Sequence, residues 1–123
     1  MITLSYQTGQ PIYEQIVEQI KIHVMKGYLK SGDVIPSVRK MALEIGVTPN
    51  TVAKAYQELE RQKVIVTIPG KGTFIAEKTK VYVDKDKLEK IQGVIKGQLV
   101  ELKMMGYTSE DTVKLVKKIY ESL

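Results

Sequence analysis

Residues 45–50 end one helix and start another with almost no chain between them, and few folds accommodate such a junction. The connecting residues are Gly46-Val47-Thr48-Pro49. Gly46 can adopt the positive φ that ends many helices. Thr48 is placed to cap the next helix, because its hydroxyl can accept a bond from a free backbone N–H, and Pro49 suits the first helical turn. Two short helices therefore follow each other almost directly.

Each of these helices has one apolar face. Ser37 can cap the first, which covers about residues 38–45 and carries Val38, Met41, Ala42 and Ile45 on one side. The second runs from Pro49 to about Arg61, and its buried stripe is expected to contain Val52, Ala55, Tyr56 and Leu59. The positions left on its outer side or exposed first turn are Asn50, Thr51, Lys54 and Gln57. A polar, cationic face therefore points away from the core.

A third amphipathic helix precedes this pair. A short strand is expected at residues 2–5, and Pro11 is placed to begin a helix, where its missing N–H costs nothing. Gly27 ends the helical pattern, whose apolar members are Ile12, Ile16, Val17, Ile20 and Val24. Residues 31–36 are expected to form a turn, because Gly and Asp tolerate its backbone angles and Pro36 restricts the residue before it. The chain is then expected to enter the next helix in a strand-like conformation.

A hairpin is predicted after the paired helices. Residues 64–68 and 73–76 are rich in β-branched and apolar residues, and Pro69-Gly70-Lys71-Gly72 between them offers glycines for positive φ. The order of elements predicts an α+β fold: a winged helix-turn-helix of three helices and a β-hairpin wing. The recognition helix would span about residues 49–61, and the wing tip about residues 69–72.

Residues 79–123, the tail, form a second module. Asp84 is a start signal for a long helix, Gly106-Tyr107 interrupts the pattern, and Thr108 with Asp111 resembles a capping box before a last helix. Apolar residues recur along both helices: Leu88, Ile91, Ile95, Leu99 and Leu102 in the first, and Val113, Val116, Ile119 and Tyr120 in the second. The expected domains are residues 1–78, which bind DNA, and residues 79–123, a helical dimerisation tail.

The apolar stripes of the tail need a partner, because about 40 residues cannot bury them in a core of their own. Residues 1–78 could cover them, or the same tail in a second subunit. A long helix that follows a linker favours the dimer. The residues expected to form the dimer contact are Leu88, Ile91, Ile95, Leu99, Leu102, Val116, Ile119 and Tyr120.

Composition excludes several classes of protein. The absence of cysteine removes disulfides, thiolate metal sites and cysteine nucleophiles, and the single histidine, His23, has no converging acid or base in the pattern. Gly70-Lys71-Gly72-Thr73 lacks the spacing of a phosphate-binding loop and does not lead into a helix. We therefore expect no catalytic residue, no metal site and no cofactor.

Charge and hydropathy indicate the partner and the compartment. Residues 1–80 contain eleven Lys and Arg against seven Asp and Glu, whereas the remainder contains eight against seven. This excess favours an anionic partner such as nucleic acid, although solvated surfaces often carry as much. No apolar run approaches the roughly 18–20 residues that cross a bilayer, and the start does not resemble a signal peptide. We expect a soluble, cytoplasmic protein with no membrane partner.

Helix-turn-helix geometry suggests which residues would meet DNA. The first helix of the pair crosses the phosphate backbone, and the first turn of the second meets base edges. Arg39 is placed to bind a phosphate or a guanine edge, whereas Thr48, Asn50 and Thr51 surround a helix N-terminus that attracts phosphate. Asn50 is the better base reader, because an amide can pair with adenine in two places. The alternatives are that Thr48 serves as a cap, that Asn50 and Thr51 are ordinary first-turn residues, and that Arg39 is an ordinary surface cation.

Four sequence blocks closely resemble the GntR family of bacterial transcription regulators. They are GDVIPSVR at residues 32–39, IGVTPNTV at 45–52, YQELE at 56–60 and GKGTF at 70–74. Their order and spacing match the family over about residues 10–77. The short two-helix tail looks like that of the YtrA subgroup, whose members are similar in size and dimerise through it.

The resemblance implies that Arg39, Thr48, Asn50, Thr51, Gly70 and Gly72 bind DNA. With the residues that helix-turn-helix geometry places beside them, the expected DNA-binding set is Ser37, Arg39, Thr48, Pro49, Asn50, Thr51, Lys54, Gly70, Lys71 and Gly72. Many family members carry arginine where this chain has Pro49, so Asn50 or Lys54 would take over part of the readout. Larger members also have a ligand-binding domain that a tail of about 40 residues cannot contain. An unidentified small-molecule effector stays open as a further partner.

These features together imply a transcription regulator that binds palindromic double-stranded DNA as a homodimer, and the resemblance to the family implies that it is a repressor. The recognition helix would enter the major groove, and the wing would lie on the adjacent backbone or minor groove. A winged helix that serves protein–protein contact is the rival interpretation, since it shares the fold and needs no basic docking face.

Overall fold

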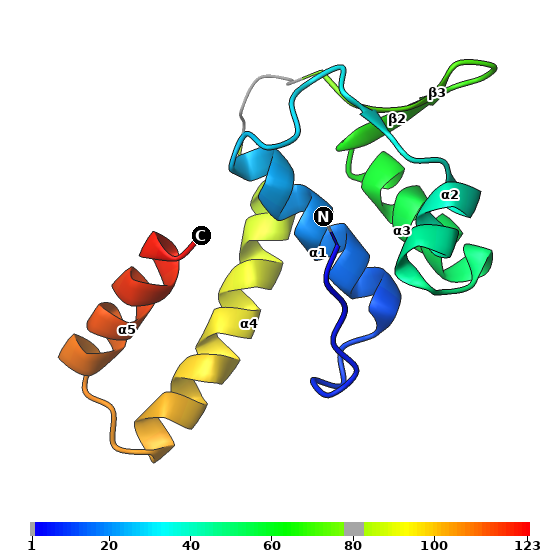
Figure 1. Cartoon of the computed structure of the whole chain (residues 1–123). Coiled ribbons are helices and arrows are strands. Elements are labelled where there is room, and N and C mark those ends of the chain that lie inside the picture. Colours follow the sequence, from blue (N-terminus) through cyan, green and yellow to red (C-terminus); the bar gives the residue numbers. More distant parts are fainter. Residues whose placement is uncertain (1, 78–82) are drawn as a thin grey trace. The chain divides into compact units, whose positions relative to one another are not determined.

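The computed structural model describes residues 2–77 and 83–123, and this part of the chain contains five helices and three strands (Figure 1). The chain divides into two compact units, Met1–Lys78, the head, and Thr79–Leu123, the tail. The expected junction at residues 78–79 lies outside the described residues. Within the described ranges, no helix is both long enough and apolar enough to cross a bilayer.

The head confirms the predicted winged helix-turn-helix. Its elements are α1 (Ile12–Met25), β1 (Val34–Ile35), α2 (Val38–Ile45), α3 (Pro49–Arg61), β2 (Ile65–Ile68) and β3 (Gly72–Ile75). The helix α3 contacts α1, α2 and β2, so it is the central element of the head. The hairpin of β2 and β3 extends away from the three helices (Figure 1).

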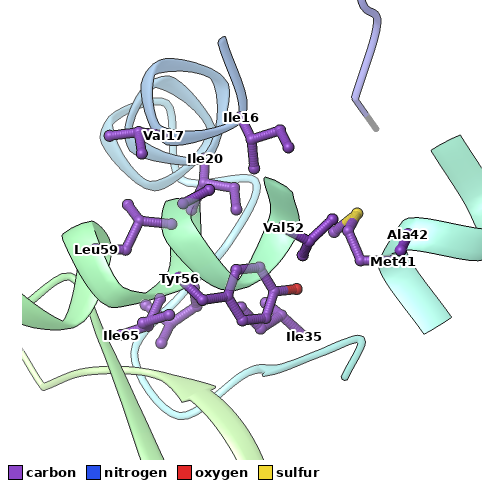
Figure 2. Close-up of a cluster of buried hydrophobic side chains, with 12 residues drawn as sticks. Ile16, Val17, Ile20, Ile35, Met41, Ala42, Val52, Tyr56, Leu59 and Ile65 are labelled. Atoms are coloured by element: carbon purple, nitrogen blue, oxygen red, sulfur yellow. The ribbon is translucent and has the colours of Figure 1, made fainter. Parts of the chain in front are cut away.

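The core is assembled on one side of α3. The predicted stripe is confirmed, because Val52, Ala55 and Leu59 are 0% exposed and Tyr56 is 4% exposed. The other helices and the sheet contribute the side chains that pack against it: Ile16, Val17, Ile20, Ile35, Met41, Ala42, Ile65 and Ile75 (Figure 2). Burial of these apolar surfaces is the main favourable contribution to folding of the head.

The sheet has three strands, because the strand-like segment expected before the second helix pairs with the predicted hairpin. Its order is β1-β3-β2 with antiparallel pairing. Val34 pairs with Phe74, and Ile35 pairs with Thr73. Gly32 does turn the chain with φ of 87°. The next residues become a strand because β3 offers them its free backbone groups, which the local sequence does not reveal.

The strand predicted at residues 2–5 is wrong. The backbone of this segment pairs with two side-chain amides of α1 and not with a neighbouring strand. The N–H of Thr3 donates to Gln19 Oε1 at 2.8 Å, and Gln19 Nε2 donates to the carbonyl of Thr3 at 2.5 Å. Gln15 makes the same pair of bonds with Ser5, at 2.8 and 2.7 Å. Each glutamine amide thus offers the donor and the acceptor that a partner strand would provide.

The helix ends are mostly as the sequence predicts. Ser37 Oγ accepts the N–H of Lys40 at 3.2 Å, and Gly46 ends α2 with φ of 71°. Thr48 occupies the N-cap position of α3, as expected, but its hydroxyl makes no bond to a backbone N–H. The hydroxyl shares a hydrogen bond with Thr51 Oγ1 at 3.0 Å instead.

The tail consists of α4 (Lys85–Met104) and α5 (Ser109–Glu121). Asp84 caps α4 by accepting the N–H of Lys87 at 3.1 Å, and Thr108 with Asp111 forms the predicted capping box of α5. No described tail residue is buried, and the side chains of the predicted stripes are at least 40% exposed, apart from the half-buried Leu102. The described tail therefore has no core of its own.

Tyr56 provides a test of how α3 is fixed in the head. Its hydroxyl donates to the carbonyl of Pro36 at 2.6 Å, just before α2, and burial raises its pKa to about 12, so it remains a donor at neutral pH. We expect Tyr56→Phe to lower the free energy of unfolding by about 1 kcal/mol, the usual contribution of one hydrogen bond. Urea denaturation of the full chain at constant protein concentration measures this change.

The exposed Tyr6 provides the matched control. Tyr6→Phe removes a hydroxyl of the same kind and should leave the unfolding midpoint unchanged. Equal effects of the two substitutions would show that the bond to Pro36 does not stabilise the head.

Candidate nucleic-acid interface

The start of α2 carries two exposed cations. Arg39 and Lys40 follow the capping residue Ser37, and within residues 2–77 no ion pair or side-chain hydrogen bond engages either of them. The Ser37 oxygen already accepts a backbone N–H, which leaves its O–H available as a donor. Sequence reasoning omitted Lys40 from the site, although its place on the exposed side of this helix was a usable signal.

The start of α3 exposes polar groups, and one of them has no partner within the described head. Thr48, Pro49 and Asn50 are exposed, and Thr51 is half-buried. The Asn50 amide makes no hydrogen bond within the described head, so its donor and acceptor are free to pair with a ligand. The backbone N–H groups of this first turn also give the helix end a partial positive charge. This end of α3 is therefore suited to an anionic, hydrogen-bonding partner.

The tip of the hairpin is a tight turn that exposes a lysine. The N–H of Lys71 donates to the carbonyl of Ile68 at 3.0 Å, with Pro69 and Gly70 between them. Gly70 has φ of 77°, which fits the third position of a type II turn, and Gly72 has φ of 129°. Lys71 is exposed and has no ionic partner in the described head.

Lys54 lies about one turn after Asn50 on α3. It is exposed, as predicted for the outer side of α3, and its Nζ lies 4.0 Å from the centre of the Tyr13 ring on α1. Burial and the neighbouring carboxylate of Glu14 raise the pKa of Tyr13. Sequence reasoning missed Tyr13, because the contact joins two helices and no local pattern indicates it.

The predicted site residues thus fall into groups on separate elements. Ser37 and Arg39 share the start of α2, Thr48 to Thr51 share the start of α3, and Gly70 to Gly72 form the hairpin tip. No hydrogen bond joins one group to another within residues 2–77. A site spread over three elements fits an extended ligand better than a small molecule.

The outer surface of α3 also carries an acidic residue, but its charge is compensated. Glu58 accepts hydrogen bonds from Arg61 Nε at 2.9 Å, from a second Arg61 nitrogen and from Gln62 Nε2 at 2.8 Å. These bonds lower the pKa of Glu58 to about 2. Its carboxylate is therefore held at the C-terminal part of α3, away from the exposed first turn.

The described residues offer little that resembles a metal or catalytic centre. His23 Nδ1 lies 2.6 Å from the carbonyl oxygen of Gln19, one turn earlier in α1. No group of three or more His, Cys, Asp or Glu residues in the described ranges could hold a metal ion.

Comparison with known proteins supports a regulatory role for this arrangement. Residues 12–75 match the model of the family described as "Bacterial regulatory proteins, gntR family". The HTH-type transcriptional repressor YtrA of Bacillus subtilis is 40% identical over 119 residues, which cover 97% of this chain and 92% of that protein.

Solved structures agree with the sequence relatives. A Listeria monocytogenes protein described as a transcriptional antiterminator is similar to this chain with a TM-score of 0.90 and 46% identity, over 98% of this chain and 90% of that chain. The DNA-binding domain of AraR, in complex with operator ORE1, is similar with a TM-score of 0.53 and 28% identity. That match covers 62% of this chain and 93% of that chain.

These findings confirm the resemblance drawn from the four sequence blocks. The family model covers both helices of the helix-turn-helix and the hairpin, and the YtrA match continues through the tail. The relatives are transcription regulators rather than enzymes. The chain therefore belongs to the GntR family, as a YtrA-like DNA-binding transcription regulator.

Proposed function

We propose that this protein is a repressor that binds a palindromic operator as a homodimer. One observation carries the proposal: the start of α3 exposes the Asn50 amide, α2 exposes Arg39 and the hairpin tip exposes Lys71, and none of these side chains has a partner within residues 2–77 and 83–123. The name of the Bacillus subtilis relative, a transcriptional repressor, supports the direction of regulation. A regulator of this kind would block RNA polymerase by occupying a promoter. The protein would act in the cytoplasm.

In this proposal α3 enters the major groove with its N-terminal end towards the bases. Asn50 reads adenine through its amide, and Arg39 binds a phosphate or a guanine edge. Lys71 binds the adjacent backbone or minor groove, where the turn around Gly70 and Gly72 lets the hairpin approach closely. Pro49 begins the helix but has no donor for a base, so base readout at this end depends on Asn50.

In the same proposal the tail forms the contact with a second subunit. Its described part has no buried residue, and Ile91, Ile95 and Val116 are each about half exposed, at 46%, 51% and 52%. A second tail would remove these side chains from water. Two heads joined in this way would present their α3 helices to successive major grooves, roughly 34–36 Å apart.

We expect Arg39→Ala combined with Lys71→Ala to weaken operator binding and to reduce its dependence on salt. Each phosphate contact that is lost should lower the slope of log affinity against log salt by about one. The operator is first identified by selection from random duplex DNA, and fluorescence anisotropy then measures affinity at several salt concentrations.

Lys114→Ala with Lys118→Ala is the matched control, because it removes two exposed cations from the tail rather than from the head. It should leave the slope unchanged. A head variant that binds with unaltered affinity and slope would exclude this DNA-binding surface.

We expect the protein to be a dimer at micromolar concentration and Ile95→Glu to produce monomers, because a carboxylate would be buried without a partner at the contact. Multi-angle light scattering measures the mass. The monomeric variant should also lose the preference for a full palindrome over a half-site. Lys96→Glu, at the exposed neighbouring position, should remain dimeric. A wild-type monomer, or equal wild-type affinity for half and full sites, contradicts the proposal.

We also expect duplex RNA of the operator sequence to compete poorly with the DNA operator. The major groove of an A-form helix is too deep and narrow for α3 to read. Competition anisotropy with DNA and RNA duplexes of identical sequence tests this. Because a similar Listeria protein is described as an antiterminator, equal competition by RNA would favour that type of activity over an operator-binding repressor.

A further inference from the structure

Tyr13 and Lys54 form a contact between two helices of the head that local sequence patterns do not predict. Tyr13 is the second residue of α1, and Lys54 lies in the second turn of α3. The Lys54 Nζ atom lies 4.0 Å from the centre of the Tyr13 ring. The ring is half-buried, whereas Lys54 is exposed on the outer side of α3. A cation at this distance from an aromatic face is attracted by the ring electrons.

The charge of Lys54 is not neutralised by its nearest acidic neighbour on the helix. Glu58 lies four residues further along α3, where a salt bridge to Lys54 would be ordinary. The Glu58 carboxylate instead accepts bonds from Arg61 and Gln62. Within the described head Lys54 therefore forms no ion pair with Glu58 and lies against an aromatic ring.

The ring holds the Lys54 ammonium group in place, and the ammonium group can still bind an anion. A free lysine side chain samples many rotamers and loses that freedom when it binds. A ring that already holds the ammonium group removes part of this cost before DNA arrives. The ring covers one side of the ammonium group, so N–H donors on the other side remain available to phosphate.

We propose that Tyr13 is a positioning residue for operator binding, because its ring holds the Lys54 ammonium where it contacts the DNA backbone beside α3. This inference rests on the proposed function and deepens it. Tyr13 acts through Lys54 rather than by touching DNA itself.

Four variants of the full chain test this role: Tyr13→Phe, Tyr13→Leu, Lys54→Met, and Tyr13→Leu combined with Lys54→Met. Tyr13→Leu keeps an apolar side chain but removes the ring, and should weaken operator binding roughly three- to fivefold, as expected for one exposed cation–π contact. Its salt slope should equal that of the wild type, because the charge remains. Lys54→Met should weaken binding and lower the slope by about one.

Comparison of the double variant with the single variants shows whether Tyr13 acts on DNA binding through Lys54. The double variant should bind as Lys54→Met does, and Tyr13→Phe, which retains the ring, should bind as the wild type does. If Tyr13→Leu weakens binding equally with and without Lys54, its role is structural and the proposal is overturned. If Tyr13→Phe weakens binding as much as Tyr13→Leu, the hydroxyl acts rather than the ring, which also overturns it.

Arg39→Ala separates failure of this inference from failure of the proposed function. If Arg39→Ala weakens binding while Lys54→Met does not, the positioning role is overturned and the DNA-binding surface stands. If neither variant alters binding, both are overturned.

Discussion

The buried side of α3 is the constraint on which the head depends. Val52, Ala55, Tyr56 and Leu59 lie on one side of this helix, and α1, α2 and the sheet pack against them. Because that side is fully used by the core, the opposite side must face solvent. The bond from Tyr56 to the carbonyl of Pro36 links α3 to the segment that enters α2. The core therefore determines which residues of α3 a ligand can reach.

Charged side chains of the head differ in whether they have partners within it. Those with partners stabilise the fold, and those without partners are available for binding. At the C-terminal part of α3, Glu58 is satisfied by Arg61 and Gln62. At the start of α2 and at the hairpin tip, Arg39 and Lys71 have no such partners in the described head. Free cations cost little at an exposed surface and become useful when they meet phosphate. Lys54 falls between these two situations: an aromatic ring contacts its ammonium group, but no carboxylate of the described head pairs with it.

The tail presents the opposite situation, since its helices form without a core. Caps at Asp84 and Thr108 fix where the helices begin, but caps contribute little compared with the burial of apolar faces. Exposed apolar residues along α4 and α5 therefore make the stability of the tail depend on what covers them. If a second copy covers them, the stability of the protein depends on its concentration. DNA binding by paired heads would depend on concentration in the same way.

The sequence by itself determined the features that arise within a few residues: the stripe of α3, the turn at Gly46, the caps at Ser37 and Thr108, and the family blocks. Only the tertiary structure decided the pairing of β1 with β3, the binding of residues 2–5 by Gln15 and Gln19, and the contact of Tyr13 with Lys54. It also gave the Thr48 hydroxyl a different partner from the backbone N–H expected. Helical periodicity and caps reflect backbone geometry over one or two turns, so they can be recognised in the chain. A glutamine amide, a free strand edge or an aromatic ring acquires its partner only when folding brings distant residues together.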